Sequence, residues 1–175
     1  MSILSHYNIA FKGLSIGKHI FEYEIDGRFL GEFDGGVVDQ GLVKISLTLD
    51  KQSSLMTFWF DLKGTVRVQC DRCLEMYDQP VESQERIFVR LGEKENAEGE
   101  DLIWVSTNDY QLNVAQLIYE FICLAIPIKK VHPEDENGNS TCDPEMIEKL
   151  NQYVVREEEQ NNPVWKDLKK LLDNE

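Results

Sequence analysis

The chain reads Val66-Arg67-Val68-Gln69-Cys70-Asp71-Arg72-Cys73-Leu74 at the point where a predicted strand meets a Cys-x-x-Cys turn. The apolar residues at 66 and 68 alternate with polar ones, as in a strand with one buried face. Two thiols three residues apart can point at one centre, which a tetrahedral metal or a disulfide-exchange site requires. The strands on either side of this turn define the predicted fold.

Upstream of the turn, two stretches alternate strictly between apolar and polar residues. Their apolar positions are Phe21, Tyr23, Ile25, Val43, Ile45, Leu47 and Leu49. Residues 55–62 are apolar on both faces, which is typical of a covered central strand, and residues 81–91 alternate again. With a short strand at 102–105, residues 18–106 are expected to form a twisted antiparallel sheet of about five to seven strands. The two cysteines would then join adjacent antiparallel strands.

The pattern changes to a helical period at residue 113. Asn113 can cap a helix over 113–126, with Gln116 completing a capping box and Pro127 ending the helix. This helix is apolar nearly all round, so it is expected to cover one face of the sheet. The glycines between residues 27 and 36 predict turns or an irregular edge, and residues 1–17 show no firm period.

Two further helical segments follow. Asp143-Pro144 is a typical helix start, and Asn162-Pro163 begins a second segment in which Trp165, Leu168 and Leu171 share one face. The predicted fold class is therefore α+β: a twisted antiparallel β-sheet covered by a helix, with a helical C-terminal arm. Residues 1–160 are expected to form one domain, and residues 161–175 an amphipathic helical tail.

The composition is strongly acidic. There are 18 Lys and Arg against 32 Asp and Glu, which gives a net charge of −14. This overall field disfavours direct contact with bare nucleic acid and favours a basic protein partner. The sequence shows no signal peptide and no run of about 18 apolar residues, so a cytoplasmic protein without a membrane partner is expected.

The cysteine turn has three interpretations. In the first, Cys70 and Cys73 form half of a zinc site that His132 and Cys142 complete to a Cys3His shell. In the second, the pair is a reduced structural turn. The third is thiol redox exchange, which the position of the pair at a strand end, away from a helix start, makes less favourable. Nine residues separate His132 from Cys142, wider than the three to five that are usual between zinc ligands.

No catalytic constellation is found, and Cys123, within an apolar run, is expected to be a small core residue. An acidic belt, defined here as the carboxylates between Glu134 and Glu159, has two interpretations. It is either a solvated surface or a docking surface for a basic partner. In the second case Glu157, Glu158, Glu159 and Trp165 are the expected partner-binding residues.

Several features in the same order resemble the YceD family, the large ribosomal RNA subunit accumulation proteins. They are the turn from Val68 to Leu74, the helix end Leu124-Ala125-Ile126-Pro127, then His132 and Cys142, and Asn162-Pro163 followed by Trp165. The resemblance implies a bacterial or organellar protein that is needed for large-subunit (23S) ribosomal RNA to accumulate and has no established enzymatic activity, so a protein that is not an enzyme is expected. The expected partner is then a ribosomal protein or a large-subunit precursor. The alternative function is a zinc-binding or thiol-redox module.

Overall fold

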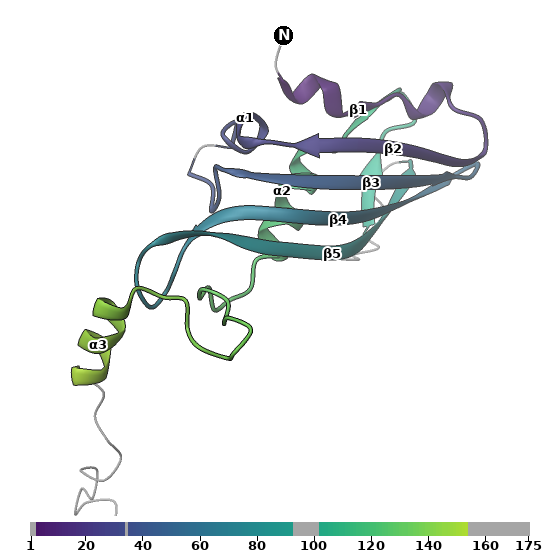
Figure 1. Cartoon of the computed structure of the whole chain (residues 1–175). Helices are drawn as coiled ribbons and strands as arrows, with labels where there is room; N and C mark the ends of the chain where they lie inside the picture. Colours follow the sequence, from purple (N-terminus) through teal and green to yellow (C-terminus); the bar gives the residue numbers. More distant parts are fainter. Residues whose placement is uncertain (1–2, 34, 93–101, 154–175) are drawn as a thin grey trace, which may run out of the picture.

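The computed structural model describes residues 3–33, 35–92 and 102–153. Its main element is a five-stranded sheet in the order β2-β3-β4-β5-β6 (Figure 1). The strands are β2 (Gly17–Ile25), β3 (Gly41–Lys51), β4 (Leu55–Gln69), β5 (Met76–Leu91) and β6 (Leu102–Val105). The described residues also form three α-helices, two short 3-10 helices and a small second sheet, so the architecture is α+β, which confirms the predicted fold class.

The direction of the last strand differs from the prediction. Strands β2 to β5 are antiparallel neighbours, but β6 runs parallel to β5, with Phe88 beside Leu102 and Leu91 beside Val105. The sheet is therefore mixed. Alternation of apolar and polar residues identifies a strand because side chains point to opposite faces, but it carries no information about the strand's direction.

The core lies on one face of the sheet. Alternate residues of β3 and β4 are buried there, among them Leu47, Phe58 and Phe60, each at most 1% exposed. Helix α2 (Ala115–Leu124) lies behind the sheet in Figure 1 and covers this face. The ring of Phe121 contacts Phe60, with centroids 5.0 Å apart in an edge-to-face arrangement. The predicted covering helix is thus present.

The start of α2 differs in detail from the predicted capping box. The side-chain oxygen of Asn113 accepts a hydrogen bond from the amide of Ala115 at 2.9 Å, as a cap would. The amide of Gln116, however, turns forward and donates to Glu120 at 2.8 Å. The helix also ends at Leu124, before Pro127, because the residue preceding a proline is disfavoured in helical conformation.

Several short elements had no detectable sequence period. They are η1 (Ile3–Tyr7), β1 (Asn8–Ile9), η2 (Phe11–Gly13), α1 (Gly27–Leu30) and β7 (Leu112–Asn113). Strands β1 and β7 form a separate two-stranded antiparallel sheet. Asp26 begins α1 by accepting hydrogen bonds from the amides of Arg28 and Phe29. The predicted irregular segment therefore contains one capped helical turn, too short to produce a period.

The C-terminal arm begins with α3 (Pro144–Tyr153), which projects away from the sheet in Figure 1. Asp143 accepts a hydrogen bond from the amide of Glu145 at 3.0 Å, in agreement with the predicted helix start. None of the residues of α3 is fully buried. The predicted tail at 161–175 lies outside the described residues, so the domain boundary at 160 stays a prediction. Among the helices described, none is both long and apolar enough to cross a membrane.

Gly64 allows β3 and β4 to lie close together. A Cβ atom there would lie 2.2 Å from the carbonyl oxygen of Leu42 and 2.6 Å from the Cα of Val43, both backbone atoms that cannot turn aside. We expect Gly64→Ala to lower the free energy of unfolding by about 1–3 kcal/mol, measured by chemical denaturation. Gly13→Ala is the matched control, because nothing lies within 4 Å of its added Cβ. Equal stability of the two variants would contradict this explanation.

Candidate metal centre

The first two candidate ligands come from the turn between β4 and β5. Cys70 follows the last residue of β4, and its amide donates to the carbonyl of Glu75 at 2.9 Å. The amide of Leu74 donates back to the carbonyl of Cys70 at 3.0 Å, which closes the turn. Leu74 has φ +64°, a left-handed conformation that costs a residue with a Cβ of the order of 1 kcal/mol. Gln69 stabilises it by donating to the carbonyl of Leu74 at 2.9 Å.

The turn is joined to the chain that follows α2. The amide of Asp71 donates to the carbonyl of Lys130, and the amide of Lys130 donates to the carboxylate of Asp71, both at 2.7 Å. Two residues later the chain reaches His132, whose ring packs against Tyr77 of β5 with centroids 4.6 Å apart. This pair of hydrogen bonds places a residue some sixty positions downstream beside the cysteine turn. Sequence analysis did not identify these roles of Asp71, Lys130 and Tyr77.

The wide spacing between His132 and Cys142 is taken up by a compact loop. Asp135 organises it: its Oδ1 accepts hydrogen bonds from the amides of Asn137 and Asn139 at 2.9 and 2.7 Å. Hydrogen bonds from the backbone and side-chain amides of Asn139 are the main reason that the pKa of Asp135 lies below its usual value. Glu134 and Ser140 form an isolated antiparallel bridge, so the loop leaves and returns at nearly the same place. A gap of nine residues is therefore compatible with two neighbouring ligands.

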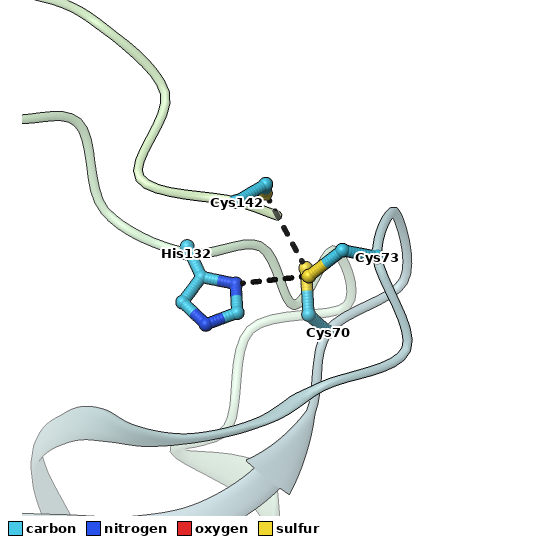
Figure 2. Close-up of side chains that lie close together, drawn as sticks. All are labelled: Cys70, Cys73, His132 and Cys142. Carbon is cyan, nitrogen blue, oxygen red and sulfur yellow. Dashed lines mark hydrogen bonds between the residues drawn. The ribbon is translucent and has the colours of Figure 1, made fainter. Parts of the chain in front are cut away.

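The four predicted ligands meet in one cluster, hereafter the Cys3His cluster: Cys70, Cys73, His132 and Cys142 (Figure 2). All four potential ligand atoms lie within 4.8 Å of one another. The sulfur atoms of Cys70 and Cys142 are 3.7 Å apart, and the sulfur of Cys73 is 3.4 Å from Nδ1 of His132. At a tetrahedral zinc ion, with bonds of about 2.0–2.3 Å, neighbouring ligand atoms are separated by about 3.5–3.8 Å. The cluster can therefore hold a metal ion of that size.

The surroundings of the cluster affect the two turn cysteines differently. Burial opposes ionisation of Cys70, but hydrogen bonds from the amides of Cys73 and Arg72 and from His132 lower its pKa to about 6. The amide of Arg72 is 3.5 Å from the sulfur. Burial raises the pKa of Cys73. One thiolate is thus favoured near neutral pH even without an ion, and thiolates are the form of cysteine that binds metals.

The three thiols of the cluster are shielded from solvent, whereas His132 is half-buried. The exposed fractions of Cys70, Cys73 and Cys142 are 0%, 3% and 4%. Catalytic zinc sites keep a position open for water or substrate, whereas structural sites have four protein ligands. Exchange with an external disulfide likewise needs an accessible thiol. The arrangement therefore matches a structural metal centre better than a catalytic or redox site.

The other predicted site residues have different outcomes. Cys123, predicted to be a core residue, is partly buried and packs against the core. The expected partner-binding residues Glu157, Glu158, Glu159 and Trp165 lie outside the described residues, and their role stays a prediction.

Removal of both turn cysteines tests the metal centre. We expect Cys70→Ser with Cys73→Ser to lower thermal stability much more than Cys123→Ala. A structural zinc site contributes on the order of 10 kcal/mol of apparent binding energy, against about 1–3 kcal/mol for truncation of a small side chain. Thermal denaturation of the protein purified without chelator, together with metal analysis, measures both effects. Equal shifts of the melting temperature in the two variants, with no metal in the wild type, would mean that the two cysteines form a structural turn without a metal ion.

Comparison with known proteins identifies the family. The model of the family described as large ribosomal RNA subunit accumulation protein YceD matches residues 59–172. The matched region begins in β4, contains all four residues of the Cys3His cluster and extends past α3. Neither a curated protein nor a solved structure was found that matches the chain. Since the family model covers well over half of the sequence, the chain belongs to the YceD family of large ribosomal RNA subunit accumulation proteins.

Proposed function

We propose that this protein is a non-enzymatic factor that supports accumulation of large-subunit ribosomal RNA and assembly of the large ribosomal subunit. The family match over residues 59–172 is the observation that carries the proposal. The buried thiols of the Cys3His cluster are compatible with it, since they offer no open position to a substrate. A cytoplasmic location, expected from the sequence, is part of the same proposal.

We also propose that the Cys3His cluster binds zinc as a structural ion. Three thiolates and one imidazole are the ligands that zinc prefers, and soft sulfur ligands exclude magnesium and calcium. The ion would join the β4–β5 turn to the chain on both sides of the loop at 134–140. Its role would therefore be to fix the start of α3 relative to the sheet.

The acidic belt is the proposed docking surface for a basic ribosomal protein or a large-subunit precursor. Within the described part of the chain its exposed carboxylates are Glu134, Asp135, Glu136, Glu145 and Glu148. They lie on the loop and the helix that the cluster positions. Opposite charges increase the rate of encounter, and the surface of α3, none of whose residues is fully buried, is open to a partner.

Depletion of the protein in its own host tests the main proposal. We expect the ratio of large-subunit to small-subunit ribosomal RNA to fall, and free small subunits to accumulate in sucrose gradients. The wild-type chain and the Cys123→Ala variant should restore the ratio. An unchanged ratio on complete depletion would overturn the proposed function.

The acidic belt can be tested separately through its salt dependence. We expect capture of basic ribosomal proteins from lysate to weaken steeply as salt rises, because screening shortens electrostatic attraction to about 8 Å at physiological ionic strength. Replacing Glu157, Glu158 and Glu159 by Gln should reduce capture while the melting temperature stays nearly constant.

A matched control removes three exposed carboxylates elsewhere, at Glu24, Glu32 and Glu75. This second triple variant should capture normally. Capture that does not depend on salt concentration and is the same for both triple variants would argue against an acidic docking surface.

A further inference from the structure

The sheet face opposite α2 is uncovered. Figure 1 shows α2 behind the sheet, and no other described helix lies over its front. We call the side chains that point to this side on β2 to β6 the open face. Alternation of less and more exposed positions along β2, β3 and most of β4 identifies them, although Thr57 on this side of β4 is buried. The strand register aligns them in rows across the sheet. One such row runs Ile20, Thr48, Trp59 and Arg86.

A hollow of about 570 Å³ lies at the middle of the open face. Trp59, which is 39% exposed, lines it together with polar groups on three strands. These include the hydroxyls of Ser46 and Thr48, the carboxylate of Asp61, the amide of Gln84 and the guanidinium of Arg86, and Phe60 and Glu85 complete the lining. Gln84 donates to Asp61 at 3.2 Å, which fixes both groups beside the indole. The hollow thus combines a flat aromatic surface with hydrogen-bond donors and acceptors.

Two arginine and aromatic pairs extend from the hollow to the edge of the sheet. The guanidinium of Arg86 lies over the ring of Phe88, 4.8 Å from its centroid, and that of Arg90 lies over Trp104 at 5.4 Å. Arg86 and Arg90 are four residues apart on one strand, which separates their Cα atoms by about 13 Å. Cations and stackable rings therefore alternate along a line that starts at Trp59.

The charge of the open face differs from that of the whole protein. On β2 to β5 it carries six cations and six carboxylates. They are Lys18, Lys44, Lys63, Arg67, Arg86 and Arg90, with Glu22, Glu24, Asp50, Asp61, Asp78 and Glu82. The face is thus neutral in a chain of net charge −14. Screening confines electrostatic fields to about 8 Å at physiological ionic strength, so a bound group responds mainly to its nearest charges. These are Arg86 and Arg90 at the aromatic end of the face, with Asp61 in the hollow.

We infer that the open face binds single-stranded RNA, with one base stacked on Trp59 in the hollow and phosphates beside Arg86 and Arg90. Unpaired bases are recognised by stacking on aromatic rings and guanidinium planes and by hydrogen bonds to base edges, and the face offers all three. An apolar protein segment fits less well, because polar groups line the hollow and arginines separate the rings. A basic protein would meet Arg86 and Arg90 at the aromatic end of the face, so it fits this end less well than a phosphate chain does. The inference deepens the proposed function, on which it rests for the natural source of the RNA.

Fluorescence anisotropy with a labelled oligouridine of about ten nucleotides tests the inference on the full-length protein. We expect saturable binding that Trp59→Ala weakens about tenfold or more, whereas Trp59→Phe keeps most of it. Replacing Arg86 and Arg90 by Ala should weaken binding and reduce its salt dependence. Each phosphate of a single strand that the protein neutralises adds about 0.7 to the slope of log affinity against log salt, so this slope should fall by about 1.4. An RNA duplex should bind less well, because its bases are already stacked.

Lys44→Ala with Lys63→Ala is the matched control. It removes two cations from the same face: Lys63 lies four residues along β4 from Trp59, and Lys44 is its partner on β3. This variant should change the affinity less than twofold. Circular dichroism checks that every variant is folded.

If oligouridine does not bind even at high micromolar concentrations of the protein, the inference is overturned. Equal losses of affinity in the double variant at Lys44 and Lys63 and in the double variant at Arg86 and Arg90 would also overturn it. Loss of ribosomal-protein capture in Trp59→Ala, with oligouridine binding unchanged, would assign the face to a protein. Since the probe has no ribosomal sequence, failure here leaves the depletion experiment as an independent test of the proposed function.

Discussion

The pairing of β4 with β5 is the constraint on which the rest of the structure depends. It continues from Leu55 beside Arg90 to Gln69 beside Met76, so one hairpin runs the full length of the sheet. Because side chains alternate along it, the same hairpin supplies Phe58 and Phe60 to the core and Trp59 to the open face. Its turn carries Cys70 and Cys73. The core, the open face and the metal centre therefore all take residues from this one strand pair and its turn.

Sequence patterns predicted the parts of this structure that repeat locally. Alternation located the long strands, and the period of apolar residues located α2, because both patterns reflect burial of one face. The parallel direction of β6 was not predictable in this way, since strand direction is set by the connection and not by the pattern. The single turn of α1 and the two-residue strands β1 and β7 are shorter than any period that could identify them.

The metal centre shows the same division between local and distant information. Cys-x-x-Cys indicated the first two ligands by its spacing alone, and His132 with Cys142 followed from residue type. The spacing of these residues does not predict the chain geometry that brings the four ligands together. That geometry depends on the reciprocal hydrogen bonds between Asp71 and Lys130 and on the turn that Asp135 organises. All three are ordinary polar residues whose role is evident only when distant segments are in contact.

The proximity of Cys142 to the first turn of α3 has a consequence for how the C-terminal arm works. Asp143 caps α3 one residue after a cluster ligand, so the helix starts from a fixed point on the sheet. A binding segment attached through a rigid element is confined to a small volume, whereas a segment on a flexible linker explores a larger volume and has a lower effective concentration. Metal occupancy would therefore set the effective concentration of the arm near a partner already bound to the sheet. The ion would hold the start of α3 in place relative to the sheet without contacting that partner.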